Sequence, residues 1–280
     1  MNQTANPLRK YFRQPVIFLR LPSGGKFYPP GTIQMPENGE LPIYPMTAVD
    51  EIATRTPDAL FNGSTIMEII RSCVPNILDP WAVHSGDLNA LLAAVRLASY
   101  GSEMEISSSC PKCNHVHQIS MDLRIVLDQQ QMPNYEQPLV AGDLTIHCSP
   151  MTYRQINEVG KVQYEDQKII NMINQVDLSE EEKMAKLGEA FKRITALTIR
   201  SIANSIGAIR TADAMVTDQD QIHEFLINSP KIVFDSIKDH ISKLRTASEI
   251  KPIKMTCEEC SHEYDQTFTL DVTNFFVTAS

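Results

Sequence analysis

Two Cys-x-x-Cys pairs constrain this chain more than any other feature of its sequence. The first is Cys110-Pro-Lys-Cys113 and the second is Cys257-Glu-Glu-Cys260, and a histidine follows each pair two residues later. The short turn inside such a pair directs both thiolates at one centre, and two pairs complete a tetrahedral shell around a metal ion. We therefore predict that Cys110, Cys113, Cys257 and Cys260 together bind one structural Zn²⁺ ion.

The long stretch of chain between the two pairs is no obstacle to a shared site. Loop-closure entropy rises by only about 0.6 kcal/mol per doubling of loop length, whereas structural zinc contributes roughly 10–16 kcal/mol in small peptides. The alternative interpretation is two unrelated reduced pairs, and a redox role is disfavoured because no thioredoxin-like βαβ pattern surrounds them. Four thiolates fill the shell, so we expect His115 and His262 not to bind the ion. Cys73 lies in an expected apolar helix and Cys148 in an expected strand, so we expect each to be a small buried hydrophobic residue.

The composition is that of an ordinary globular protein. Of the 280 residues, 42% are apolar and 21% are charged, and the formal net charge is -9. This charge disfavours a broad basic face of the kind that nucleic acids and anionic membranes require. The apolar run at residues 16–19 is too short for a signal peptide or a membrane span, so we expect the chain to remain in the compartment where it is made.

Hydrophobic periodicity predicts an α+β fold with a mainly helical core, β-hairpins and a zinc-ribbon-like site formed by two distant knuckles. Residues alternate at period two on both sides of each cysteine pair, which predicts strand, knuckle and strand twice. Turn signals at Asn38-Gly39 and Gly142-Asp143 predict two hairpins, and Gly101 is expected to end a helix over residues 87–100. In a helix that begins at Ser179, a buried face is expected from Leu187, Phe191, Ile194, Leu197 and Ile202.

These patterns divide the chain into four expected segments. They are an extended or hairpin N-terminal arm (1–46), helices with the first knuckle (47–125), a hairpin and helical region (126–248), and the second knuckle with a C-terminal strand (249–280).

Three short strings recur in the same order and suggest an internal duplication. Pro-Met-Thr occurs at residues 45–47 and 150–152, Arg-x-Ala-Ser at 96–99 and 245–248, and the Cys-x-x-Cys-x-His string also occurs twice. The alternative is that junctions and knuckles reuse similar residues for local reasons.

No catalytic motif is present in the sequence. The Gly24-Gly25-Lys26 turn lacks the residues of a P-loop, because Arg20 stands where the first glycine is required and Phe27 where Ser or Thr binds magnesium. There is no GxSxG, HExxH or GxGxxG string. Four protein ligands would also leave the metal no open position for water. We therefore expect no enzyme activity, no catalytic residue and no small-molecule substrate.

A series of strings in the N-terminal part resembles a known family. In order they are Leu21-Pro-Ser-Gly-Gly-Lys-Phe-Tyr-Pro, Tyr44-Pro-Met-Thr-Ala-Val-Asp-Glu51, Leu60-Phe-Asn-Gly63, Ile69-Ile-Arg-Ser-Cys-Val74, Leu91-Leu-Ala-Ala-Val-Arg96, and Tyr100-Gly101 ahead of the first cysteine pair. Over residues 15–125 the chain resembles the baseplate hub and hub-assembly proteins of T-even-type contractile-tailed bacteriophages, whereas residues 150–245 carry no matching strings. The resemblance implies a non-enzymatic protein of the virion or of tail assembly. It would bind other baseplate proteins in the host cytoplasm and lie in the tail baseplate.

The cysteine knuckles by themselves are also typical of a cytoplasmic zinc-ribbon protein, either a nucleic-acid-binding protein or a regulatory protein. Acidic residues beside the second knuckle, such as Glu258 and Glu259, disfavour that alternative. For the baseplate interpretation, the candidate partner-binding residues are the aromatics of the arm, because extended arms can add strands to a neighbour's sheet. They are Phe12, Phe18, Phe27 and Tyr28; the alternative is that they pack against the chain's own helices.

Overall fold

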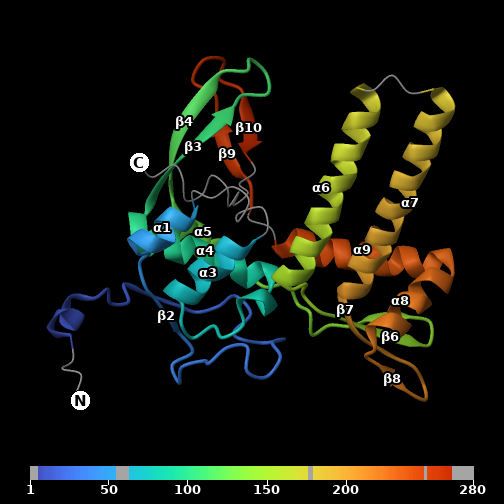
Figure 1. Cartoon of the computed structure of the whole chain (residues 1–280), viewed down its shortest axis with the longest axis horizontal. Coiled ribbons are helices and arrows are strands. Elements are labelled where there is room, and N and C mark those ends of the chain that lie inside the picture. Colours follow the sequence, from blue (N-terminus) through green and yellow to red (C-terminus); the bar gives the residue numbers. More distant parts are fainter. Residues whose placement is uncertain (1–5, 55–62, 176–178, 249–250, 267–280) are drawn as a thin grey trace. The chain divides into compact units, whose positions relative to one another are not determined.

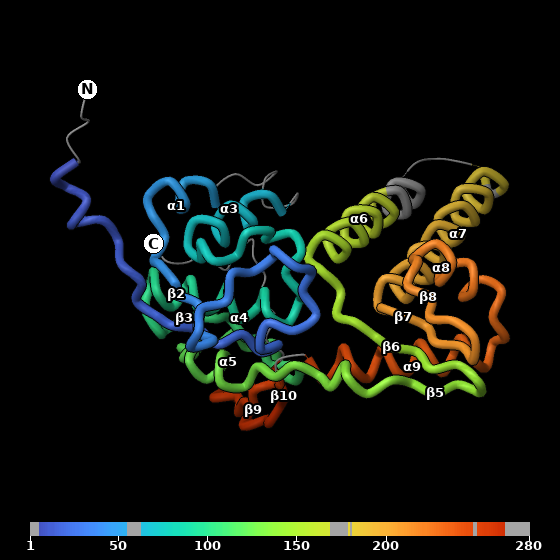
Figure 2. Tube along the Cα trace, turned by 90° about the horizontal axis from the view of Figure 1, so that it is seen from below, coloured from blue at the N-terminus to red at the C-terminus, as the bar shows by residue number. Residues whose placement is uncertain are grey.

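The computed structural model describes residues 6–54, 63–175, 179–248 and 251–266. The chain forms two compact units, shown in Figures 1 and 2. The knuckle unit comprises Met1–Pro80, Asp87–Gln130 and Ile250–Ser280, and the helical unit comprises Trp81–Gly86 and Gln131–Glu249. The predicted α+β class is confirmed, whereas the four-segment division stays a prediction.

The knuckle unit combines short helices with three two-stranded antiparallel sheets, which are β1–β2, β3–β4 and β9–β10. Its elements are η1 (Pro7–Tyr11), β1 (Ile17–Leu19), β2 (Leu41–Ile43), α1 (Ala48–Thr54), α3 (Ser64–Cys73), most of α4 (Ser85–Tyr100), β3 (Glu103–Ser109), β4 (Val116–Asp122), α5 (Leu123–Gln129), β9 (Ile253–Thr256) and β10 (Glu263–Gln266). A short 3₁₀ turn, η2 (Pro80–Ala82), precedes α4. The core of the knuckle unit includes Ile69 and Ile70 of α3 and Leu91 of α4, none of which is exposed. As predicted, α4 ends directly before Gly101, whose φ of 90° is readily adopted only without a Cβ.

The first predicted hairpin is paired differently from the expectation. The turn at Gly39 is present, but the strand after it, β2, pairs with β1 and not with the residues just before the turn. Those residues pair elsewhere, since Ile33 forms a bridge with Ile77. A strand selects its partner by burial of its side chains, and Leu41 and Ile43 are completely buried.

The helical unit is built on a four-stranded antiparallel sheet in the order β5-β6-β7-β8. The strands are β5 (Leu139–Ala141), β6 (Leu144–Cys148), β7 (Ile206–Arg210) and β8 (Met215–Val216), and the helices are α6 (Tyr153–Gln175), α7 (Glu180–Asn204), α8 (Gln219–Asn228) and α9 (Lys231–Ser248). The predicted hairpin at Gly142-Asp143 is confirmed as β5–β6, with Ala141 opposite Leu144. Its core joins β6 and β7 to α7, α8 and α9 through Ile146, Cys148, Ile202, Ala203, Ile206, Ile209, Ile222, Leu226, Ile237, Ile241 and Leu244.

Helices α6 and α7 form a long antiparallel pair (Figures 1 and 2). Arg193 of α7 bonds the buried carboxylate of Asp166 on α6 at 2.7 Å. The predicted buried position of Phe191 is wrong, because 64% of this residue is exposed. The contact face of α7 instead passes through Ala190, one residue earlier, so the phenyl ring is turned to the solvent. Within the described helices, none is both long and apolar enough to span a bilayer.

Several contacts occur once in each half of the sequence, as the duplication hypothesis requires. Each Pro-Met-Thr string opens a helix through the threonine: Thr47 and Asp50 cap each other at α1, and Thr152 and Gln155 do so at α6. The residue two positions before each of these methionines donates its backbone N–H to the carbonyl at the end of a helix. The pairs are Tyr44 with Cys73 and Ser149 with Ser205.

The buried carboxylate of Asp87 holds the glycine-rich turn near residue 24 in place. It accepts hydrogen bonds from the Ser23 backbone N–H at 2.9 Å, the Tyr28 hydroxyl at 2.7 Å, and the Ser23 hydroxyl. Because Asp87→Asn removes one acceptor oxygen and its charge, we expect the free energy of unfolding to fall by about 1–3 kcal/mol.

Chemical denaturation measures this loss, with Tyr28→Phe as the comparison. That variant removes a single donor and should lose only about 1 kcal/mol. A smaller loss for Asp87→Asn than for Tyr28→Phe would contradict this role of the carboxylate.

Candidate metal centre

Two β-hairpins present the four paired cysteines. Strands β3 and β4 pair from Glu103 opposite Asp122 to Ser109 opposite Val116, so that residues 110–115 form the loop. Strands β9 and β10 pair with Thr256 opposite Glu263, and residues 257–262 form the second loop. Both predicted strand, knuckle and strand arrangements are confirmed, with loops of equal length.

The two knuckle loops have the same backbone hydrogen bonds. In the first, the Cys110 N–H donates to the His115 carbonyl and the Asn114 N–H donates to the Cys110 carbonyl, both at 2.9 Å. In the second, Cys257 with His262 and Ser261 with Cys257 repeat these bonds, again at 2.9 Å.

The residue after the second cysteine of each loop adopts a left-handed backbone. Its φ is 58° at Asn114 and 53° at Ser261. Left-handed residues are uncommon outside glycine. Their occurrence at equivalent positions shows that both loops have one specific local shape.

The four sulfur atoms converge on one point. All four lie within 4.8 Å of one another. Two of the separations join one cysteine from each loop, at 3.7 Å for Cys110 with Cys260 and 3.5 Å for Cys113 with Cys257. These distances exceed the roughly 2.05 Å of a disulfide, and all four cysteines are free thiols.

The spacing also fits a tetrahedral tetrathiolate site. A metal–sulfur bond of about 2.3 Å implies sulfur–sulfur separations of about 3.8 Å. Cys110 and Cys257 are buried, whereas Cys113 is exposed and Cys260 half-buried. The four thiols can therefore hold a metal ion at the surface of the knuckle unit.

The thiols differ in how readily they ionise. Burial opposes ionisation of Cys110, but hydrogen bonds from the backbone N–H groups of Cys113 and Lys112 and from neighbouring thiols lower its pKa to about 6. A hydrogen bond from the His115 backbone N–H lowers the pKa of Cys113. Burial and the neighbouring sulfur atoms outweigh it and raise this pKa to about 12. Four adjacent thiolates repel one another, so a bound cation is needed to keep them all ionised.

Side-chain contacts support the meeting of the two hairpins. The Ser108 hydroxyl of β3 bonds the Tyr264 hydroxyl at 2.8 Å and the Gln266 side-chain oxygen at 2.5 Å, both on β10. These bonds lie on the strands that lead to and from the knuckles, so the hairpins are aligned beyond the sulfur cluster itself.

The other predicted site residues lie apart from this cluster. His115 and His262 contribute backbone carbonyls to the loops, while their rings contact His117 and Tyr264 respectively. In the arm, Phe12 and Phe18 are more than half exposed, at 56% and 57%.

The remaining two arm aromatics are less accessible. Phe27 is 38% exposed, and the Tyr28 hydroxyl is bound to Asp87. A metal role for the cysteines and a partner-binding role for the aromatics both stay predictions.

Sequence reasoning did not anticipate a cavity in the helical unit that contains Arg245. Its walls come from separate helices and from the turn before α6, so no local spacing pattern marks it. The Arg-x-Ala-Ser string at residues 245–248 was the single available signal, and it indicated only a repeat.

A family model described as T4 bacteriophage base plate protein matches residues 16–277 of the chain. No curated protein and no solved structure matches the chain. The match extends through the middle region, where the sequence strings gave no resemblance.

Proposed function

The chain belongs to the T4 bacteriophage base plate protein family, and we propose that it acts in the hub region of a contractile-tail baseplate as a non-enzymatic structural or assembly component. The observation that carries this proposal is the family match over residues 16–277. Members of a baseplate assemble by binding one another, so the partners proposed here are other baseplate proteins.

The cysteine cluster is proposed to bind Zn²⁺ with a structural role. A tetrahedral all-thiolate shell suits zinc or an iron–sulfur cluster, and zinc is favoured here because the 4.8 Å cluster of four sulfur atoms leaves room for a single ion. Four protein ligands saturate tetrahedral zinc and leave no position for water or substrate. The ion would join the β3–β4 hairpin to the β9–β10 hairpin and so fix the shape that partners recognise.

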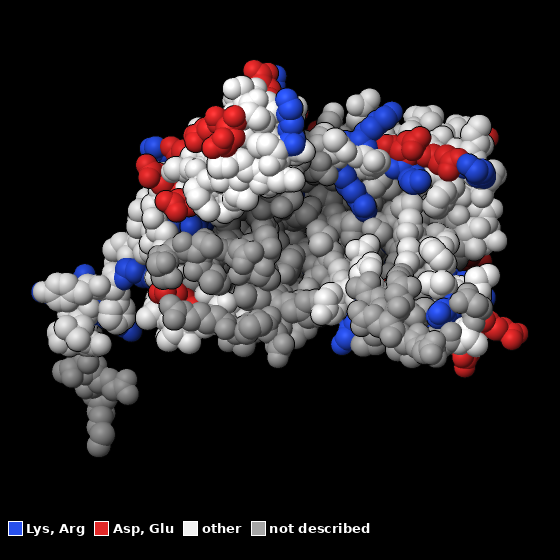
Figure 3. Space-filling view, turned by 90° about the horizontal axis from the view of Figure 1, so that it is seen from above, with Lys and Arg blue, Asp and Glu red and all other residues white. Residues whose placement is uncertain are grey.

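Surface charge supports protein partners over nucleic acid. Glu258, Glu259 and Glu263 are exposed at the second knuckle, where a nucleic-acid-binding ribbon would carry Lys and Arg. On the face shown in Figure 3, acidic and basic side chains of the described residues are interspersed and do not form one continuous basic patch.

The arm is proposed to contact a partner through Phe12 and Phe18. Arg13 fixes the base of the arm, because its guanidinium donates to the Ser72 carbonyl at 2.8 Å and pairs with Asp50 at 3.3 Å. Strand β1, which contains Phe18, pairs only with β2 among the described strands, so one edge can accept a strand. The Tyr28 hydroxyl is bound to Asp87 and Phe27 is less exposed than Phe12 and Phe18, which supports these two as the main contact residues of the proposal.

Mass spectrometry of purified virions and of baseplates isolated from infected cells tests the proposed function. Presence in the virion supports a structural component, and presence in baseplate intermediates alone supports an assembly factor. Absence from both would contradict the proposal.

Replacing Phe12 and Phe18 together by alanine is expected to impair baseplate assembly without destabilising the chain. Both rings are more than half exposed, so the change in unfolding free energy should stay within about 0.5 kcal/mol. Baseplates per infected cell, counted after gradient sedimentation, should fall at least about tenfold if the rings are interface anchors.

A control variant, Val49→Ala with Ile52→Ala, removes two side chains of α1 that are 76% and 67% exposed. It should assemble normally. Equal assembly by the two double variants would refute the arm as the contact surface.

A further inference from the structure

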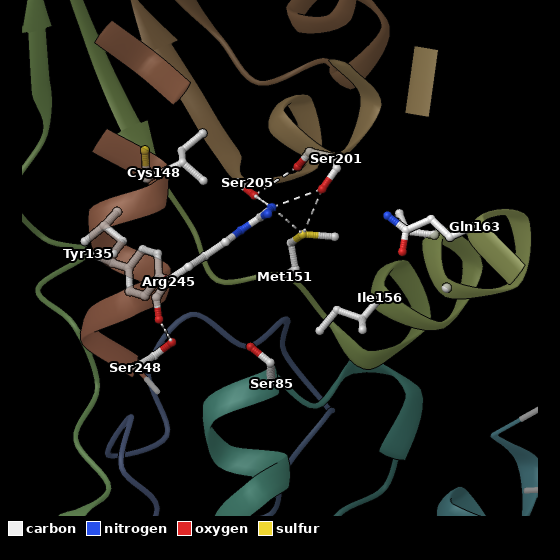
Figure 4. A pocket seen from close by; sticks show the side chains of 14 residues that line it. Ser85, Tyr135, Cys148, Met151, Ile156, Gln163, Ser201, Ser205, Arg245 and Ser248 are labelled. Carbon is white, nitrogen blue, oxygen red and sulfur yellow. Dashed lines mark hydrogen bonds between the residues drawn. The ribbon is translucent and has the colours of Figure 1, made fainter. Parts of the chain in front are cut away.

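A cavity of about 380 Å³ lies within the helical unit (Figure 4). Its walls come from α6, α7 and α9, from the first residue of α4, from the end of β6, and from the segments before β5 and after β6. One part is apolar and includes Met151, Ile156, Val159, Ile241 and Leu244. A volume of this size is at the lower end of the range of small-ligand sites, roughly 300–1,000 Å³.

Arg245 of α9 is the charged residue of this cavity, and no acidic residue lines it. One of its Nη atoms donates to the Ser201 hydroxyl at 3.0 Å, the Ser205 hydroxyl at 3.2 Å and the Met151 Sδ at 3.3 Å. Figure 4 shows the guanidinium directed at these three groups. All three acceptors are neutral, and one of them is a thioether, which accepts hydrogen bonds weakly.

Some other arginines of the chain have carboxylate partners. Arg13, Arg124 and Arg193 pair with Asp50, Asp122 and Asp166 respectively. Within the described ranges, Arg245 has no such partner, and its Nε and second Nη make no hydrogen bond. A planar guanidinium edge with two unused donors matches the geometry of a carboxylate.

The serine hydroxyls do not neutralise the guanidinium. Ser205 donates its own proton to the Ser201 carbonyl at 3.0 Å, and Ser201 donates to the Met151 Sδ at 3.7 Å. Both hydroxyl oxygens therefore serve Arg245 as polar but uncharged acceptors. A carboxylate in the cavity would add the anion that this cluster lacks.

We propose that the cavity binds an apolar group that carries a carboxylate, with the carboxylate on Arg245 and the apolar part against α6 and α9. An apolar residue at the free C-terminus of a polypeptide has this chemistry, and so does a small apolar organic acid. The proposal stands on the helical unit alone and depends neither on the metal nor on the proposed function.

N-acetyl-leucine and N-acetyl-leucinamide are the first probes, because they differ only in the carboxylate. In NMR titrations of the ¹⁵N-labelled full chain, N-acetyl-leucine should shift the amide signals of Met151, Ser201 and Ser205. The amide should bind at least about tenfold more weakly, since it lacks the charged hydrogen bonds. Equal binding of both probes, or no shift with either, would overturn the proposal.

A third probe, N-acetyl-Gly-Gly-Leu, distinguishes the two sources of the ligand. Tighter binding of this peptide than of N-acetyl-leucine supports a polypeptide C-terminus. Equal affinities support a free organic acid, and both results are consistent with the proposed site.

Arg245→Gln should weaken N-acetyl-leucine binding at least about tenfold. Its matched control is Arg200→Gln, since Arg200 lies on α7, is exposed and does not line the cavity. This control should bind as the parent chain does. An equal loss in both variants would show that only net charge matters and would overturn the proposal.

Gly160→Leu tests the cavity itself without removing any contact. Gly160 lies on α6 at the cavity wall, and a Cβ there would meet no atom within 4 Å. The leucine should fill the space and abolish binding while favouring the helix. Gly188→Leu on α7, where a Cβ is equally free, should leave binding unchanged. Undiminished binding by Gly160→Leu would place the ligand elsewhere and refute the assignment.

Discussion

Replacing Cys257 and Cys260 together by serine is expected to abolish metal binding and to release the β9–β10 hairpin from the β3–β4 hairpin. Two of the four sulfur ligands are lost, and a Zn²⁺ ion held by Cys110 and Cys113 alone would need two waters to complete its shell. The metal content should fall from about one ion per chain to none. This is the largest effect expected of any substitution considered, because structural zinc in small peptides contributes roughly 10–16 kcal/mol.

Hydrogen exchange locates the consequence. Amides of residues 253–266 should lose protection, because the bonds of Ser108 to Tyr264 and Gln266 would remain but the ion that joins the two knuckles would be lost. Amides of the α7–α9 core should keep theirs, since this core belongs to the other compact unit. Chelation of the parent chain should give the same pattern.

Cys73→Ala and Cys148→Ala are the matched controls for the loss of thiols. Both cysteines are buried and lie outside the cluster. Burial is the main reason that the pKa of each thiol is raised to about 11. Neither thiol therefore competes as a thiolate ligand. Each variant should retain about one ion per chain. Undiminished zinc in the double serine variant would refute the shared site.

Features set by a few neighbouring residues were predictable from the sequence. The start of a helix at Ser179 and the alternation beside each knuckle depend on spacing along the chain, and both are present in the structure. The meeting of the two distant cysteine pairs was predictable for a different reason. A tetrahedral ion needs four ligands, so each pair on its own is incomplete.

Features set by the choice of a packing partner were not predictable. The alternation in Leu41–Ile43 identifies a strand, but its pairing with Ile17–Leu19 depends on which surface buries it. The exposure of Phe191 depends on which face of α7 meets α6. The hydrophobic periodicity of the helix is almost equally compatible with a contact face that passes through residue 190 or through residue 191. The cavity around Arg245 combines residues of four helices, so it exists only once those helices have packed.

Ile206→Ala is expected to lower the free energy of unfolding of the helical unit by about 2–5 kcal/mol. Ile206 lies on β7, is not exposed at all, and belongs to the core that joins the sheet to α7, α8 and α9. Alanine leaves a cavity that the surrounding side chains fill only in part. Chemical denaturation followed by circular dichroism measures the loss. Ile232→Ala on α9, where the isoleucine is 76% exposed, should change stability by less than about 0.5 kcal/mol.

The same variant should keep its zinc, and this result would separate the two units. All four cysteines belong to the knuckle unit, and the helical unit is part of the chain that links the two knuckles. If that link unfolded, the entropy of closing it would grow only logarithmically with its length, by about 0.6 kcal/mol per doubling. This term is small beside the free energy of a four-thiolate zinc site. Metal analysis after partial denaturation of Ile206→Ala tests the argument, and loss of zinc together with the helical unit would show that the knuckles depend on its fold.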